Sequence, residues 1–160
     1  MREMYIATHG RYAEGIISGL NLLIGEEHGV TPICAYCGEI GSTAELAVRF
    51  EDFALQAAAR GNELVLFTDM AGGSVNNTAI QMMMKYPHVH VISGVSLIMV
   101  MEFCMSEHSD TVQRLQDAIA AATDAMQYMN ALPEIIAARR EITSVVPDNN
   151  DDFFSEEGGL

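Results

Sequence analysis

Short apolar segments alternate with longer segments of helical periodicity along most of this chain, and that alternation restricts the fold more than any other feature. The clearest short segment is ELVLFTD, residues 63–69, whose run LVLF is continuously apolar, as is typical of a parallel strand covered on both faces. Three further strands are predicted at residues 3–8, 30–36 and 88–93. Strands that alternate with helices predict an α/β fold with a doubly wound, mainly parallel four-stranded sheet flanked by helices.

The segments between the predicted strands carry the helical pattern. In residues 11–25, aliphatic side chains recur at helical spacing up to Gly25, which can end the helix. Ser42 and Thr43 can cap a helix that ends near Gly61, because their hydroxyl groups can accept free amides of its first turn. The remaining predicted helices cover residues 76–85, 95–105 and 110–129.

A histidine, an aspartate and a glycine-rich turn stand at the ends of the first and third predicted strands. His9 follows the first strand, Asp69 ends the third, and Gly72, Gly73 and Ser74 form a turn before the next helix. In doubly wound sheets, ligands bind at the carboxyl ends of the strands, near the point where the strand order reverses. We therefore expect these residues to lie together.

The chemistry of these residues is complementary. A carboxylate bound to one ring nitrogen of a histidine fixes its tautomer, and the other ring nitrogen is then free to act as a nucleophile. A Gly-Gly-Ser turn at a helix start offers amides and a hydroxyl group to phosphate oxygens. Together, His9, Asp69 and the turn predict a site for a transient phosphohistidine. Each also has a plainer interpretation, as a packed histidine, a turn or capping aspartate and an ordinary loop.

Five stretches are specific when they are taken together in this order and spacing: IATHGRYAEGIISG, LLIGEE, CGEIGS, LVLFTDMAGGSVNNTA and VISGVSLIMVMEF. With them the chain resembles, from residue 4 to about residue 130, the IIA components of the mannose family of the bacterial sugar phosphotransferase system. The resemblance implies a phosphoryl carrier in which His9 accepts the group from the phosphocarrier protein HPr and donates it to a IIB component. It also implies that Asp69 orients His9 and that Ser74 lies beside the phosphate. In-line transfer of this kind requires no metal or cofactor.

Two positions in the glycine-rich motif depart from the family's pattern. Val75 and Asn76 stand where the family usually has proline and a bulky residue, and Asn77 matches the final asparagine. A later departure is SLIM at residues 96–99, where Asn-x-Pro-Met is frequent. Since the histidine, the aspartate and the glycines are intact, these departures concern partner fit and sugar pathway rather than phosphoryl transfer.

The resemblance further implies a homodimer in which a fifth, antiparallel strand is exchanged between subunits, and an indirect association with the membrane components IIC and IID. Residues 126–131 would supply that strand, and residues 142–146 are the alternative because β-prone residues occur there too. We assign residues 1–146 to one domain with its core at residues 1–131. The polar, acidic residues 147–160 are predicted to form a disordered tail.

Composition restricts the partners and the location. A net charge of −14 over 160 residues argues against binding to nucleic acid or to an anionic membrane surface. The longest apolar runs are broken by Gly, Ser or charged residues, so no transmembrane helix is predicted, and the first residues lack the apolar segment of a signal peptide. We therefore expect a cytoplasmic protein with reduced cysteines.

Two other residue pairs have rival interpretations. His88 and His90 alternate on one predicted strand as metal ligands can, but there is no evident third ligand and strand packing explains them without a metal. Cys34 and Cys37 have the spacing of a redox pair. A redox pair of this kind normally opens a helix, whereas Cys34 lies within a predicted strand.

The function also has two alternatives. The THG around His9 is superficially similar to the RHG motif of histidine phosphatases, but those enzymes need an arginine where Thr8 stands. A regulatory module that has kept the fold and senses phosphorylation is the other alternative. The transported sugar is not predicted, because specificity in this system belongs to the membrane components.

Overall fold

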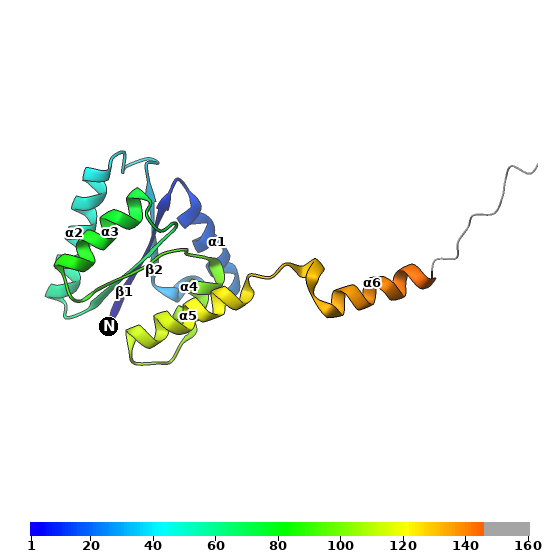
Figure 1. The fold of residues 1–160 in the computed structure, drawn as a ribbon. Helices are drawn as coiled ribbons and strands as arrows, with labels where there is room; N and C mark the ends of the chain where they lie inside the picture. Colours follow the sequence, from blue (N-terminus) through cyan, green and yellow to red (C-terminus); the bar gives the residue numbers. More distant parts are fainter. Residues whose placement is uncertain (146–160) are drawn as a thin grey trace, which may run out of the picture. The chain divides into compact units, whose positions relative to one another are not determined.

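Four parallel strands form the central sheet in the computed structural model, which describes residues 1–145 (Figure 1). They are β1 (Arg2–His9), β2 (Val30–Ala35), β3 (Glu63–Thr68) and β4 (Val89–Ile92), in the spatial order β2-β1-β3-β4. All three strand pairings are parallel, and the predicted strands are confirmed. The chain places β2 on one side of β1 and then β3 and β4 on the other, so the strand order reverses between β1 and β3.

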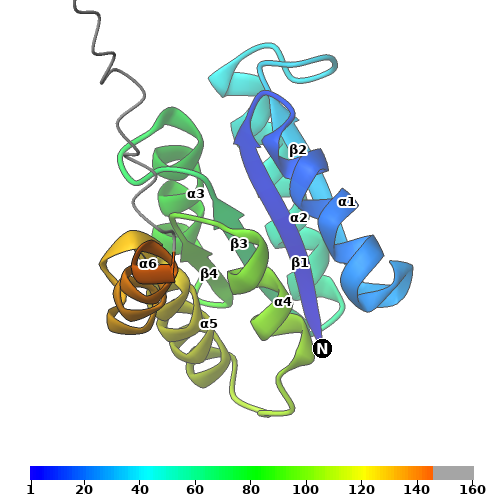
Figure 2. The same ribbon diagram turned by 90° about the vertical axis from the view of Figure 1, so that its right-hand side faces the viewer.

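The helices alternate with the strands, as the sequence pattern predicts. They are α1 (Tyr12–Ile24), α2 (Thr43–Ala59), α3 (Ser74–Lys85), α4 (Leu97–Met105) and α5 (Thr111–Ala125), with a short 3₁₀ turn, η1, at Glu26–His28. Figures 1 and 2 show α2 and α3 on one face of the sheet and α1, α4 and α5 on the other, which is the predicted doubly wound arrangement. Within residues 1–145, no helix is both long and apolar enough to cross a membrane.

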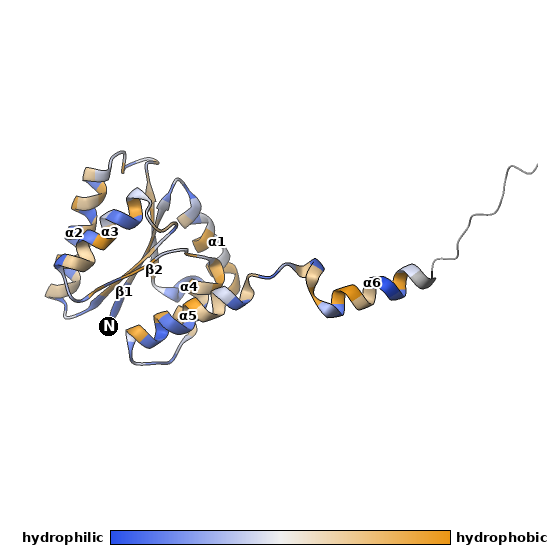
Figure 3. Ribbon diagram, viewed as in Figure 1, coloured by the Kyte–Doolittle hydropathy of each residue, from blue (hydrophilic) through white to orange (hydrophobic). Residues whose placement is uncertain are grey.

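Two apolar layers, one on each face of the sheet, hold these helices in place. Alternate residues of β3 point to opposite faces, so Val65 and Phe67 belong to the layer under α1, α4 and α5, whereas Leu64 and Leu66 belong to the layer under α2 and α3. All four side chains are fully buried. Phe67 meets Phe103 of α4 edge to face, with 5.4 Å between ring centroids. Figure 3 shows the apolar residues along the strands and on parts of each helix, consistent with this burial.

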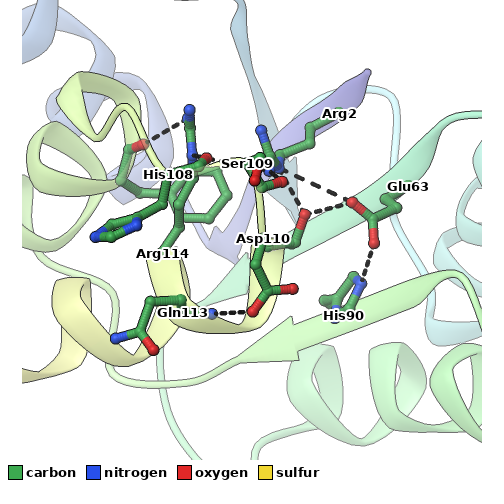
Figure 4. Close-up of polar contacts among 10 residues, drawn as sticks. Arg2, Glu63, His90, His108, Ser109, Asp110, Gln113 and Arg114 are labelled. Atoms are coloured by element: carbon green, nitrogen blue, oxygen red, sulfur yellow. Dashed lines mark hydrogen bonds and ion pairs between the residues drawn. The ribbon is translucent and has the colours of Figure 1, made fainter.

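A polar cluster ties the amino ends of β1 and β3 to the start of α5 (Figure 4). Arg2 donates its Nε–H to Thr111 Oγ1 at 2.6 Å, and the Thr111 hydroxyl donates to the Glu63 carboxylate. The same carboxylate lies 3.2 Å from His90 Nε2. Because Arg2 begins β1 and Glu63 begins β3, this cluster fixes α5 at the end of the sheet opposite the carboxyl ends of the strands.

The chain divides into two compact units, residues 1–125 and the residues from Met126 onward. In the second unit Met129–Ala131 forms a 3₁₀ turn, η2, and Pro133–Val145 forms the helix α6. Neither segment predicted to supply the exchanged fifth strand is a strand in the described residues of this single chain, so the exchanged strand is not shown and stays a prediction.

Helix-forming residues outweigh the β-prone ones in this unit. Pro133 occupies the first helical position, where its missing N–H removes no helical hydrogen bond, and Glu134 places a negative charge in the first turn. Residues 137–141 are Ala, Arg and Glu, all good helix formers. The predicted tail at residues 147–160 lies outside the described residues, and the domain boundary at residue 146 stays a prediction.

Ser42 caps α2 in a reciprocal arrangement with Glu45. Its Oγ accepts the Glu45 amide at 3.2 Å, and the Glu45 carboxylate accepts the Ser42 amide at 3.0 Å. We expect Ser42→Ala to lower the free energy of unfolding by about 1 kcal/mol in denaturant titrations, because a first-turn amide loses its partner. Ser18→Ala, at an exposed position inside α1, is the control and should change it by less than about 0.5 kcal/mol. Equal losses in the two variants would contradict the capping role.

Candidate functional site

The carboxyl ends of β1 and β3 bring together two of the residues that the sequence singled out. His9 is the last residue of β1, and Asp69 directly follows β3. The two strands are hydrogen-bonded neighbours with Ala7 opposite Thr68, so the residues that follow them meet at the strand ends. This is the point where the strand order reverses, which is where α/β sheets bind ligands.

One carboxylate oxygen of Asp69 holds both the backbone and the ring of His9. Oδ2 accepts the His9 amide N–H at 2.8 Å and lies 2.8 Å from Nδ1 of the ring. The other oxygen, Oδ1, accepts the Met70 amide at 2.8 Å. An ionised carboxylate can only accept hydrogen bonds, so Nδ1 carries a hydrogen, and in the neutral ring Nε2 keeps its lone pair.

The environment of Asp69 favours its ionised form. Burial raises the pKa of this carboxyl group, of which only 15% is exposed. Hydrogen bonds from the His9 amide, the His9 ring and the Met70 amide, together with the charge of His9, act in the opposite direction and outweigh it. The pKa of Asp69 therefore lies below its ordinary value, and at neutral pH the carboxylate is available to stabilise positive charge on the imidazole.

The free ring nitrogen of His9 faces the first turn of α3. Nε2 lies 3.1 Å from Ser74 Oγ, and 39% of the His9 side chain is exposed. The first amides of α3, which begins at Ser74, have no partner within the helix and form the positive end of its dipole. A nucleophilic nitrogen thus stands at the open edge of a region that favours negative charge.

Two glycines shape the turn between β3 and α3 for different reasons. Gly72 has a φ of +78°, which side chains rarely adopt. At Gly73 a Cβ would lie 2.8 Å from Met70 Cγ and 3.3 Å from His9 Cε1, so a side chain there would have to displace Met70 and would crowd the ring. Both amides have partners, because Gly72 donates to Asn76 Oδ1 and Gly73 to the Met70 carbonyl, each at 3.2 Å. Phosphate contacts from these amides would require an exchange of partners, whereas the hydroxyl of the next residue already lies beside Nε2.

Asn76 fixes this turn from inside, a role that the sequence reasoning missed. Its side-chain oxygen accepts the Gly72 amide, and its Nδ2 donates to Thr68 Oγ1 at 2.9 Å. The Thr68 hydroxyl donates in turn to the Ile92 carbonyl of β4 at 3.0 Å. Asn76 is only 4% exposed, so this buried side chain ties the Gly72 amide of the turn to Thr68 in β3. The available signal was the unusual amide at this position of the motif.

Thr8 and Tyr36 complete the surroundings of His9. Thr8 is fully buried and accepts the Ala13 amide at 2.8 Å, which satisfies a first-turn amide of α1 behind the histidine. Tyr36 directly follows β2, and its hydroxyl lies 2.6 Å from Ser74 Oγ. No sequence signal pointed to Tyr36, because its approach depends on a left-handed backbone conformation with a φ of +61°.

The alternating histidines His88, directly before β4, and His90, within it, have structural partners. His88 Nε2 lies 2.8 Å from the Ala54 carbonyl, and His90 Nε2 lies 3.2 Å from the Glu63 carboxylate. In the part of the chain that the structure describes, no group of three His, Cys, Asp or Glu side chains could hold a metal ion. Hydrogen bonding at the edge strand therefore accounts for this pair.

The three cysteines are free thiols. Cys34 lies in β2 and Cys37 in the turn that follows, and both line a cleft of about 440 Å³ to which His9, Asp69 and Ser74 do not contribute. Neither cysteine opens a helix, as a redox pair of this spacing normally does.

Cys104, in α4, should resist thiol reagents in the folded protein. Burial raises the pKa of its thiol to about 11, although the nearby Arg114 charge acts in the opposite direction. At pH 8 only about one molecule in a thousand then carries the reactive thiolate. We expect slow alkylation at pH 8, measured by mass spectrometry, that accelerates as the pH rises toward 11. The denatured chain is the control and should react rapidly, and rapid labelling of the folded protein at pH 8 would contradict the assignment.

Comparisons of sequence relate this geometry to known proteins. The family profile described as "PTS system fructose IIA component" matches residues 3–120. The sorbose-specific EIIA component of the phosphotransferase system of Klebsiella pneumoniae is 32% identical over 125 residues, which cover 76% of this chain and 88% of that protein. The mannose-specific EIIAB component of Escherichia coli K12 is 30% identical over 105 residues, which cover 66% of this chain but only 32% of that longer protein.

Solved structures share the fold. The phosphotransferase system component EIIA of Streptococcus agalactiae has a TM-score of 0.72 at 22% identity and covers 82% of this chain and 100% of its own. A putative phosphoenolpyruvate-dependent sugar phosphotransferase system permease of Klebsiella pneumoniae has a TM-score of 0.71 at 28% identity. The match covers 81% of this chain and 92% of that one. The first of these likenesses concerns the fold alone.

Proposed function

Since the chain belongs to the fructose, mannose and sorbose family of phosphotransferase system IIA components, we propose that it is a phosphoryl carrier that takes the group from phospho-HPr onto His9 and passes it to a IIB component. The observation that supports this most strongly is the fixed His9 ring. Its Nδ1–H is held by Asp69 Oδ2 at 2.8 Å, and its Nε2 is left with a lone pair beside Ser74 at the exposed edge of the site.

In the first transfer His9 Nε2 attacks the phosphorus of the donor. The nitrogen supplies its lone pair, the bond between phosphorus and the donor breaks, and the donor keeps that electron pair. No proton has to leave Nε2, because the ring already presents the tautomer that can attack. Asp69 keeps its hydrogen bond to Nδ1–H and stabilises the positive charge that develops on the ring.

Negative charge on the phosphoryl oxygens is balanced by groups on the other side of the ring. The Ser74 hydroxyl releases Nε2 and donates to a phosphoryl oxygen, and the first-turn amides of α3 face the same charge. Positioning and electrostatics therefore account for an in-line transfer. The second transfer, to IIB, follows the same geometry in reverse.

The proposal includes the partners of such a carrier. HPr and IIB bind in turn over the carboxyl ends of β1 and β3, and contact with the membrane components IIC and IID is indirect. We also propose that the chain forms a homodimer, on the strength of the family resemblance. The carrier does not need to contact the sugar, so none of these residues is assigned to sugar recognition.

The experiment that tests the proposal is a reconstituted transfer. The protein is incubated with phosphoenolpyruvate, enzyme I and HPr, and we expect one acid-labile phosphate that maps to His9. Addition of IIB should then discharge it onto IIB. Labelling confined to other histidines would overturn the assignment; these are His28, His88, His90 and His108.

The same experiment separates the two alternatives. Release of inorganic phosphate without IIB would indicate a histidine phosphatase, and a stable phosphoprotein that IIB cannot discharge would indicate a regulatory module. The phosphatase interpretation lacks its arginine, because Thr8 is buried against the Ala13 amide and the exposed Arg11 is bound to Glu14 at 2.8 Å.

A further inference from the structure

Tyr36 reaches the His9 site from a third strand end. Among the residues that the structure describes, it is the only non-glycine residue in the left-handed region, with a φ of +61°. Its amide donates to the Ile40 carbonyl at 2.6 Å and closes the turn that holds this conformation. The conformation brings its ring to 5.4 Å from the His9 ring, centroid to centroid. A tyrosine in a strained backbone conformation beside a reactive histidine points to a functional role.

A chain of hydroxyl groups leads from this turn to the nucleophilic nitrogen. Tyr36 Oη lies 3.0 Å from Thr43 Oγ1 and 2.6 Å from Ser74 Oγ. Ser74 Oγ lies 3.1 Å from His9 Nε2. The four groups form one continuous series of contacts at hydrogen-bonding distance.

The Asp69 carboxylate sets the direction of every hydrogen bond in this series. His9 Nδ1 donates to Asp69, so in the neutral ring, the form that can attack phosphorus, Nε2 can only accept and Ser74 donates to it. A hydroxyl group has a single hydrogen, so Ser74 Oγ accepts from Tyr36 and the Tyr36 oxygen accepts from Thr43. Tyr36 thereby determines where the hydrogen of Ser74 points.

We propose that Tyr36 is a positioning residue for phosphoryl transfer at His9 and that it acts through Ser74; this inference rests on the proposed function. In the resting protein Tyr36 keeps the Ser74 hydrogen on Nε2. As phosphorus approaches, the Ser74 hydrogen turns to a phosphoryl oxygen, while the hydrogen bond from Tyr36 holds Ser74 Oγ in place. The new bond forms from the Nε2 lone pair, the donor keeps the electrons of the bond that breaks, and no hydroxyl group loses its proton.

Tyr12 provides a matched comparison in the same chain. It begins α1, three residues after His9, and it is half exposed, like Tyr36. Its hydroxyl donates to the Val95 carbonyl at 3.0 Å and takes no part in the series that ends at Nε2. Replacement of either tyrosine with phenylalanine removes one hydroxyl group and keeps the ring.

Rates of phosphorylation by phospho-HPr test the inference. We expect Tyr36→Phe to slow transfer about tenfold, the effect of losing one hydrogen bond in the transition state, and Tyr12→Phe to stay within about twofold of the wild type. In a Ser74→Ala background, Tyr36→Phe should lower the rate by less than about twofold, because its route to the phosphoryl group is already missing. An unchanged rate in Tyr36→Phe, or effects that multiply in the double variant, would overturn the inference.

The resting protein offers a second readout that needs no phosphoryl donor. Ring ¹⁵N chemical shifts report the hydrogen bond at His9 Nε2, so Tyr36→Phe should move the Nε2 resonance and Tyr12→Phe should not. An unmoved resonance in Tyr36→Phe would overturn the inference even where His9 is phosphorylated normally. If the wild type takes no phosphate on His9 and the resonance still moves, the proposed function fails while the hydroxyl series stands. Thermal melting of each variant checks that the fold is kept.

Discussion

His9→Gln should abolish acid-labile phosphorylation by phosphoenolpyruvate, enzyme I and HPr. The glutamine amide has no nucleophilic nitrogen lone pair, so no N–P bond can form at residue 9. The fold should persist, because the backbone amide of residue 9 still donates to Asp69 Oδ2, as it does at 2.8 Å in the wild type. Radiolabel transferred from phosphoenolpyruvate measures the effect, and the melting temperature checks the fold.

His108→Gln is the matched control for this variant. His108 is 60% exposed and lies 3.5 Å from the Asp117 carboxylate, away from the strand ends that carry His9. The His108→Gln variant should take up the label to the same extent as the wild type. Label retained by His9→Gln, or lost equally from both variants, would remove His9 from the role proposed here.

Asp69→Asn should slow phosphorylation of His9 by roughly ten- to a hundredfold, which corresponds to about 1.5–3 kcal/mol for a charge-assisted hydrogen bond felt in the transition state. The amide keeps the shape of the carboxylate but has no charge to stabilise the ring. It also turns an NH₂ group either toward His9 or toward the Met70 amide, both of which now donate to Asp69. The histidine then loses either its fixed tautomer or its fixed position.

The control for this variant is Asp52→Asn, which makes the same chemical change on the exposed surface of α2. Its transfer rate should match that of the wild type. Rapid-quench measurement of phosphoprotein formation compares the two variants. A wild-type rate in Asp69→Asn would reduce Asp69 to a turn residue and contradict the proposed pairing with His9.

The stability of Asp69→Asn should also differ from the wild type in a pH-dependent way. Burial raises the pKa of Asp69, but the hydrogen bonds and charge of His9 leave it below the ordinary value of 3.8. The ionised carboxylate therefore stabilises the folded state above about pH 4, and that contribution is lost as the pH falls through the folded pKa. The difference in unfolding free energy between the wild type and the variant should be greatest near neutral pH and should shrink in acid.

The meeting of His9 and Asp69 was predictable because it depends on strand order rather than on side-chain detail. Continuous apolar runs identified β1 and β3, and a right-handed doubly wound sheet places consecutive strand ends at one edge. The position of Ser74 followed from the same reasoning, since it begins the helix that leaves β3. Local sequence therefore defined both the sheet and the nucleophile's immediate neighbours.

Tyr36, Asn76 and α6 were not predicted, because their roles depend on backbone conformation and burial that the hydrophobic pattern of the sequence does not encode. Tyr36 approaches Ser74 only because it adopts a positive φ, which is rare outside glycine. Asn76 is a polar residue on the buried side of α3, where periodicity predicts an apolar one, and its partners are Thr68 of β3 and the Gly72 amide in the turn. In α6, a proline at the first position and several helix formers outweigh the β-prone residues near its end. A few β-prone residues do not by themselves distinguish a strand from the last turns of a helix.

The attachment of the His9 backbone and ring to a single oxygen of Asp69 limits how a phosphoryl carrier of this kind can work. The imidazole cannot swing between two docking positions without losing that anchor, so Nε2 is reached from one direction only. Donor and acceptor must then occupy the same space at different times. Such a carrier follows ping-pong kinetics. An excess of either protein partner slows transfer, because it occupies the surface that the other partner needs.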